Sequence, residues 1–208
     1  MLQDLLQIAQ LLTRKLVSLL VSVSPQLAPY LAGFLTAVLA EPLRQRLFRP
    51  RLKVEFRNDT NCISWTREGE TRACYLRIRA RNRKWRLARG CRAYLVNVEL
   101  RDANGRFQPT SYCDSMQLAW SAASEEAYSA IDLPRGLSRF VDVVSTRESS
   151  GDFRPALQFF LNRDLDLWRR NGEFRLTVLV AGDGIQPKSL KIRFVWTGRW
   201  DEFTVSRA

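Results

Sequence analysis

The sequence predicts a mainly β protein: an antiparallel two-sheet β-sandwich of about seven to nine strands, preceded by one or two N-terminal α-helices. Three observations support this fold class. Apolar and polar residues alternate in short runs after Pro50, turn-forming residues separate these runs, and the first forty residues contain a long apolar stretch. We therefore divide the chain into an N-terminal helical membrane-anchor segment, residues 1–48, and a sandwich domain, residues 49–208.

The N-terminal segment has the composition of a membrane-associated helix. Apolar residues recur at steps of three and four over residues 1–23, which gives a helix one broad apolar face. Residues 16–40 then contain 25 positions without a formal charge, whereas a bilayer core needs about 20. The segment expected to contact lipid includes Leu16, Leu20, Tyr30, Gly33, Phe34 and Ala37.

Several arrangements of this segment fit the sequence. One is a single span over residues 16–40, kinked near Pro25. Another is an amphipathic helix followed by a second helix from about residue 25 to 47, inserted as a hairpin or packed against partners. A soluble helical hairpin that covers the neighbouring domain is a further alternative. Gly33 and Ala37 stand four positions apart, a spacing that permits close helix–helix approach in lipid.

The charges that flank the apolar stretch predict its orientation. Only Arg14 and Lys15 precede it, whereas five basic residues follow it closely: Arg44, Arg46, Arg49, Arg51 and Lys53. An excess of Lys and Arg belongs on the cytoplasmic side of a membrane. We therefore expect an inner (cytoplasmic) membrane protein whose C-terminal domain faces the cytoplasm. The four cysteines are then expected to be free thiols, because the cytoplasm keeps thiols reduced.

The second domain consists of alternating runs that follow one another along the chain. The predicted strands lie within residues 52–56, 76–80, 94–100, 116–120, 140–144, 157–161, 174–180, 190–196 and 203–205. Turn signals fall between them at residues 104–105, 134–136 and 182–184. Residues 159–171 are expected to form a short helix or an irregular connection.

Four stretches of this domain resemble bacterial immunoglobulin-like sandwiches of the adhesion-domain (CARDB-like) type. They are YLRIRARNR, RAYLVNVEL, AIDLPRGLSRFVDVV and FRLTVLVAGDG, and the resemblance covers residues 50–208. It implies an immunoglobulin-like antiparallel sandwich. The shared motifs are structural, so the resemblance implies no functional residue.

The most conspicuous feature of the domain is a basic ridge over residues 75–90, YLRIRARNRKWRLARG. The ridge contains seven basic side chains and no acidic one, and residues 42–89 as a whole carry 15 basic and 4 acidic residues. We predict an anion- or lipid-binding set consisting of Arg44, Arg46, Arg49, Arg77, Arg79, Arg81, Arg83, Lys84, Trp85, Arg86 and Arg89. The same pattern is compatible with nucleic-acid binding, or with a strand edge that charge protects from aggregation.

The residue inventory argues against catalysis. The chain has no histidine, which excludes His-based acid–base catalysis and every His-containing metal site. No CxxC motif is present, so a zinc or iron–sulfur site is not expected either. We expect no enzymatic activity, no metal and no cofactor.

The main functional hypothesis is a membrane-anchored, non-catalytic binding protein with a basic juxtamembrane face. Its expected partners are an anionic membrane surface, a further protein, and other copies of the chain through the N-terminal helices. One alternative is a ligand-gated membrane effector that senses a nucleotide-like anion. Another is a soluble sandwich that binds nucleic acid.

Overall fold

A computed structural model describes residues 15, 30, 33, 34, 38, 40, 49–84, 86–112, 114–121, 126–159 and 164–208. The chain divides into two compact units, Met1–Phe48 and Arg49–Ala208. In the first unit Tyr30, Gly33 and Phe34 are helical and exposed, whereas Leu16, Leu20 and Ala37 lie outside the described residues. Within the part of the chain that is described, no helix has both the length and the apolar character to cross a bilayer.

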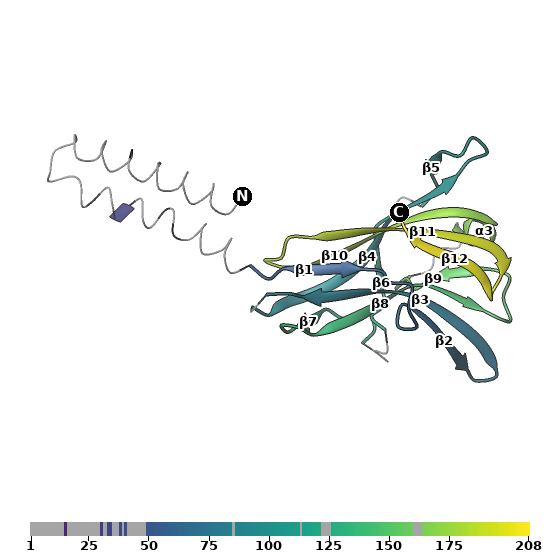
Figure 1. The fold of residues 1–208 in the computed structure, drawn as a ribbon, viewed down its shortest axis with the longest axis horizontal. Coiled ribbons are helices and arrows are strands. Elements are labelled where there is room, and N and C mark those ends of the chain that lie inside the picture. Colours follow the sequence, from purple (N-terminus) through teal and green to yellow (C-terminus); the bar gives the residue numbers. More distant parts are fainter. Residues whose placement is uncertain are drawn as a thin grey trace. The chain divides into compact units, whose positions relative to one another are not determined.

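The second unit is mainly β, and its first sheet is built around a long central strand. Five strands belong to this sheet: β1 (Leu52–Glu55), β2 (Ile63–Glu68), β3 (Thr71–Asn82), β8 (Ser138–Arg147) and β9 (Phe153–Pro155). Their order is β1-β3-β8-β9 with antiparallel pairing, and β2 forms a hairpin with the first half of β3 (Figure 1). Strand β1 pairs with the last four residues of β3.

The second sheet is built around one long strand, and three short strands pair with one edge of it. Its members are β4 (Ala88–Arg101), β5 (Phe107–Pro109), β6 (Met116–Leu118), β7 (Ile131–Leu133), β10 (Gly172–Asp183), β11 (Lys188–Arg199) and β12 (Glu202–Arg207). The order is β12-β11-β10-β4-β5, and β6 and β7 also pair with β4. In Figure 1, β3 and β8 of the first sheet run below β10 and β11 of the second.

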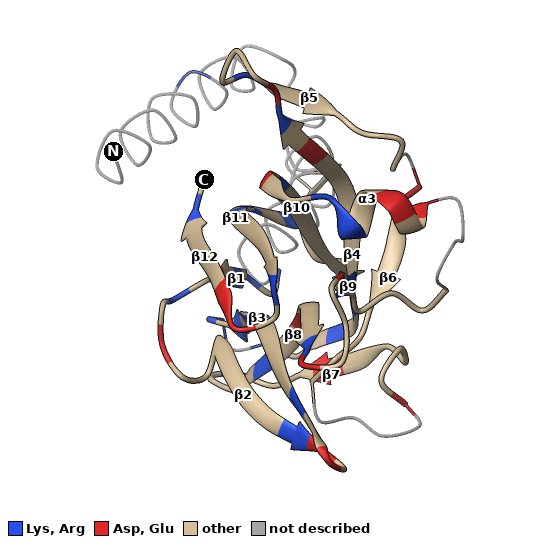
Figure 2. Ribbon diagram, turned by 90° about the vertical axis from the view of Figure 1, so that its right-hand side faces the viewer, with Lys and Arg blue, Asp and Glu red and all other residues tan. Residues whose placement is uncertain are grey.

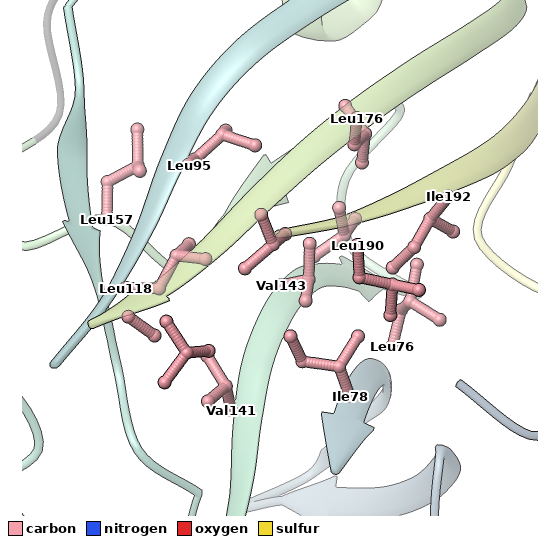
Figure 3. Packing of buried hydrophobic residues seen from close by; sticks show 14 of the residues in the cluster. Leu76, Ile78, Leu95, Leu118, Val141, Val143, Leu157, Leu176, Leu190 and Ile192 are labelled. Carbon is pink, nitrogen blue, oxygen red and sulfur yellow. The ribbon is translucent and has the colours of Figure 1, made fainter. Parts of the chain in front are cut away.

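The two sheets share one hydrophobic core. Alternation along each strand turns every second side chain inward, so Leu76 and Ile78 of β3 lie with Val141 and Val143 of β8 near Leu176 of β10 (Figure 3). The short helix α3 (Leu165–Arg169) adds the buried Trp168. The core therefore takes side chains from both sheets and from the connection between β9 and β10.

Aromatic rings fill one part of the core. Phe153 on β9 is fully buried, and its ring centroid lies 5.6 Å from that of Trp168, 4.9 Å from Phe174, 5.0 Å from Phe194 and 5.6 Å from Trp196. Each of these four pairs meets edge to face, the arrangement that the ring quadrupole favours.

The prediction of a mainly β, antiparallel two-sheet domain is confirmed, but the strand count was too low. The described residues contain twelve strands instead of seven to nine. Strands β5, β7 and β9 have three residues each, too few to show a period of two, and most of β2 is exposed on both faces.

One predicted strand, over residues 157–161, is wrong. The strand in this part of the chain is β9, which ends at Pro155, and Leu157 makes only an isolated bridge to Leu118. Residues 160 and 161 lie outside the described residues. The apolar side chains at 157 and 159 differ in placement: Leu157 is buried in the core and Phe159 is exposed.

The cysteine thiols that the structure describes are free and buried: Cys62, Cys74 and Cys91. Cys113 lies outside the described residues. Burial raises the pKa of Cys74 to about 12 and that of Cys91 to about 11, because a thiolate loses its hydration in the core. These thiols stay protonated at neutral pH.

Candidate anion-binding groove

The basic ridge begins on β3 with the predicted alternation. Leu76, Ile78 and Ala80 are buried, whereas Arg77, Arg79 and Arg81 project from the opposite face of the sheet. Side chains that alternate along a strand point to opposite faces, so three arginines two residues apart form one row.

Two arginines of this row already have carboxylate partners within the domain. The Nε atom of Arg77 donates to Asp142 of the neighbouring strand β8 at 2.7 Å. On the other side of β3, the Nε atom of Arg79 donates to Glu55 of β1 at 2.9 Å. Arg77 and Arg79 therefore tie the three adjacent strands together, and their charge is largely compensated.

The ridge continues into the loop between β3 and β4, which a buried asparagine holds in place. The amide nitrogen of Asn82 donates to the carbonyl oxygen of Arg86 at 2.6 Å and to that of Leu133 at 3.0 Å. Its side-chain oxygen accepts from the backbone N–H of Lys84 at 3.1 Å. The backbone N–H of Arg83 donates to the carbonyl oxygen of Arg51 at 2.9 Å, so this loop lies beside the start of β1.

We expect the substitution Asn82→Ala to destabilise the domain by about 2–3 kcal/mol, because it removes the side-chain donor to the buried carbonyl oxygen of Leu133 and frees the loop. Urea denaturation measures the change in the free energy of unfolding. The control is Asn58→Ala, because Asn58 is exposed and the change there should stay within about 0.5 kcal/mol. Equal effects at the two asparagines would contradict the anchoring role of Asn82.

A groove of about 670 Å³ lies where β1, the β3–β4 loop, the start of β11 and the end of β12 meet. We call it the basic groove. Seven of its lining residues are basic and one is acidic. The basic residues are Arg51, Lys53, Arg57, Arg83, Lys84, Lys188 and Arg207, and the acidic one is Glu55. Figure 2 shows basic positions around β1 and at the C-terminal tip of β12.

Glu55 lies among several cations. Lys53 and Arg79 donate to its carboxylate, and the guanidinium of Arg57 lies 3.4 Å away. Burial alone would raise the pKa of Glu55, but the hydrogen bonds from Lys53 and Arg79 outweigh burial and lower it to about 2. Glu55 is therefore ionised throughout the physiological range and neutralises part of the groove.

This depressed pKa predicts how acid affects stability. The pKa of Glu55 is lower in the folded state than in the unfolded chain, so the unfolded state binds more protons between about pH 4.5 and 2. The free energy of unfolding should therefore fall as the pH drops through that window. Glu68, Glu99 and Glu173, whose pKa values are also lowered, act in the same direction.

Denaturation at a series of pH values, for the natural chain and for Glu55→Gln, measures this dependence. The substituted chain should lose stability less steeply below pH 4.5, because it lacks this carboxylate, whose pKa folding lowers to about 2. Identical slopes for the two chains would show that the contacts of Glu55 do not form in solution.

The other predicted site residues have different positions. Arg81, Arg86 and Arg89 are exposed and do not line the basic groove. Arg49 is also exposed, and it precedes the first lining residue, Arg51, in the sequence. Arg44, Arg46 and Trp85 lie outside the described residues. Of the predicted set, the structure places Arg83 and Lys84 in the basic groove.

Sequence reasoning missed Lys188 and Arg207 as site residues. Both occur far along the chain from the ridge, at the first position of β11 and the last position of β12. In the sequence, each is only a basic residue at one end of an alternating run. Such residues are common, so this position alone does not indicate a binding site. Lys53 and Arg57 each stand two positions from Glu55 along the chain, so their contacts with it are local. Only the contact of Arg79 with Glu55 depends on the pairing of β1 with β3.

Comparison with models of known protein families found no match, and comparison with curated proteins found none either. Among the residues that the structure describes, no cluster of Cys, Asp and Glu has the arrangement of a metal site.

Proposed function

We propose that this chain is a membrane-anchored, non-catalytic binding protein whose basic groove holds anionic groups at a membrane surface. The observation that carries the proposal is the composition of the groove: seven basic side chains and one acidic side chain gathered from four separate parts of the domain. A concave surface lined by one sign of charge raises the local concentration of oppositely charged ligands.

The position of the groove along the chain supports a membrane surface as the source of the anions. Arg51 and Lys53 line it, and they follow the N-terminal unit, which ends at Phe48, by only a few residues. Electrostatic attraction to anionic lipid decays within a Debye length and contributes about 1 kcal/mol per basic residue near the surface. A domain tethered by an apolar segment next to Arg51 would keep the groove within this range.

The composition of the N-terminal segment supports the anchor. Residues 16–40 carry no formal charge, and the excess of Lys and Arg follows this stretch. Tyr30 and Phe34 are exposed in helical conformation, and such apolar rings are expected to find a non-aqueous environment. The positive flank favours an orientation in which the β domain faces the cytoplasm.

The order of the strands supports an immunoglobulin-like sandwich. One sheet has β1-β3-β8 and the other β11-β10-β4, which corresponds to the A-B-E and G-F-C arrangement of immunoglobulin-like domains. Such domains serve mainly as binding modules. The raised pKa values of Cys74 and Cys91 also favour binding over catalysis, because protonated buried thiols are poor nucleophiles.

Flotation of the purified full-length chain with lipid vesicles tests the proposal. The chain should float with phosphatidylcholine vesicles that contain phosphatidylglycerol, and it should stay with them after washes in high salt and in carbonate. Recovery of the chain in the soluble fraction without detergent would overturn the anchor. Release by salt alone would also reject the anchor, because it would show attachment by charge only. Tight binding to single-stranded DNA without vesicle binding would favour the nucleic-acid alternative.

A further inference from the structure

The basic groove contains an anion site that the domain fills with its own side chain. Lys53, Arg57 and Arg79 converge on the carboxylate of Glu55, which is only 13% exposed. Three cations around one carboxylate are the arrangement that a bound anion would need. Glu55 therefore occupies the position of a ligand.

The three cations differ in their freedom to move. The Arg79 side chain is 21% exposed, and two of its nitrogens donate to the carboxylate of Glu55. Lys53 and Arg57 are 42% and 55% exposed. Long exposed side chains reorient at little cost, so Lys53 and Arg57 can turn to an incoming anion while Arg79 keeps its bond to Glu55.

Four more cations line the groove without compensation. In the described part of the chain, no ion pair joins Arg51, Arg83, Lys188 or Arg207 to an acidic residue. An anion that also reached these residues would gain contacts that Glu55 cannot provide.

We propose that the basic groove is a site for phosphate-monoester or polyphosphate groups, and that Glu55 is an internal competitor that discriminates against singly charged anions. This inference rests on the groove being the binding surface of the proposed function. A phosphodiester carries one negative charge, as the carboxylate does, so it gains nothing by replacing Glu55 as the partner of Lys53 and Arg57. A phosphate monoester carries about 1.5 to 2 charges and three acceptor oxygens, and arginine can bind it with two parallel hydrogen bonds.

The test compares Glu55→Gln with a matched control, Glu173→Gln, in the full-length chain. Glu173 is also 13% exposed and also pairs with two basic side chains, Arg101 and Arg193, but it does not line the groove. The two substitutions remove the same charge from similar surroundings. Thermal unfolding of both variants shows whether each is folded at the assay temperature.

Three probes separate the sources of phosphate: inorganic pyrophosphate in solution, vesicles with phosphatidic acid as the monoester, and vesicles with phosphatidylglycerol as the diester at matched surface potential. The natural chain should prefer phosphatidic acid to phosphatidylglycerol. Glu55→Gln should tighten binding of phosphatidylglycerol by about fivefold, as expected when one negative charge beside the ligand is removed. It should therefore reduce the preference for phosphatidic acid over phosphatidylglycerol. Glu173→Gln should change neither.

The other possible results of this experiment distinguish the phosphate site from the proposed membrane function. Equal binding of both lipids, with no effect of Glu55→Gln, would overturn this inference and leave the proposed membrane function intact. Binding of pyrophosphate that Glu55→Gln strengthens, without binding to either vesicle, would support the inference with a free phosphate as ligand and would overturn the membrane function. A shift of the same size in Glu173→Gln would overturn the inference, because the effect would then be one of net charge.

Discussion

Reversal of three charges in the basic groove, Arg51→Glu, Arg83→Glu and Lys188→Glu together, should weaken binding of the full-length chain to anionic vesicles by at least about 100-fold. Each basic residue near an anionic surface contributes about 1 kcal/mol, and reversal adds repulsion to the lost attraction. These three residues come from three separate parts of the domain and have no acidic partner in the described part of the chain, so their loss breaks no ion pair. Vesicle flotation at a series of lipid concentrations measures the apparent Kd.

The control for this experiment changes the net charge equally on other surfaces. Arg67, Arg92 and Arg106 are exposed and lie outside the groove, and their side chains form no ion pair among the described residues. Arg67 pairs with Arg72 on β3, whereas β1 pairs with positions 79–82, about 23–33 Å further along that strand. The triple substitution Arg67→Glu, Arg92→Glu and Arg106→Glu should weaken vesicle binding by much less than the groove reversals. Equal losses in the two triple variants would mean that net charge, not the groove, determines binding.

The substitution Phe153→Ala should have the largest effect on stability, a loss of about 3–5 kcal/mol in the free energy of unfolding. Phe153 is completely buried, and four aromatic rings from α3, β10 and β11 surround it, so its removal leaves a cavity that rigid rings cannot fill by collapsing. A natural domain has a total stability of about 5–15 kcal/mol, so this change alone removes a large part of it.

Thermal unfolding followed by circular dichroism measures this effect. For a domain of this length the expected loss corresponds to a fall in Tm of about 6–20 °C. The matched control is Phe159→Ala, since Phe159 is 67% exposed and packs little. A change of less than about 1 kcal/mol at Phe153 would show that β9 does not dock against the second sheet as described.

Strand identity could be read from the sequence wherever a strand is long and has one buried face. The runs around Leu76 and Ile192 alternate because one face of each strand packs on the core and the other faces outward. Strand β2 could not be found in this way, because most of its residues are exposed. The three-residue strands β5, β7 and β9 exist only through their pairing with β4 or β8, which no local pattern encodes.

The candidate site could be predicted only in part. The sequence shows that basic residues concentrate between residues 42 and 89, and Arg83 and Lys84 belong to this block. It does not show that Arg77 and Arg79 meet Asp142 and Glu55, since those partners lie on other strands. A pattern with a period of two determines which face a side chain occupies, but strand register determines which residue lies beside it.

By itself, the sequence determined the mainly β character of the second domain, the apolar character of the first forty residues, and the block of positive charge that follows them. Only the tertiary structure decided which of these charges remain available. The pairing of β1 with β3 compensates Arg79, and the approach of β11 and β12 to β1 brings Lys188 and Arg207 to Arg51. The physical reason is that composition and alternation are properties of neighbouring residues, whereas an electrostatic site is the sum of charges that the packing of two sheets brings together.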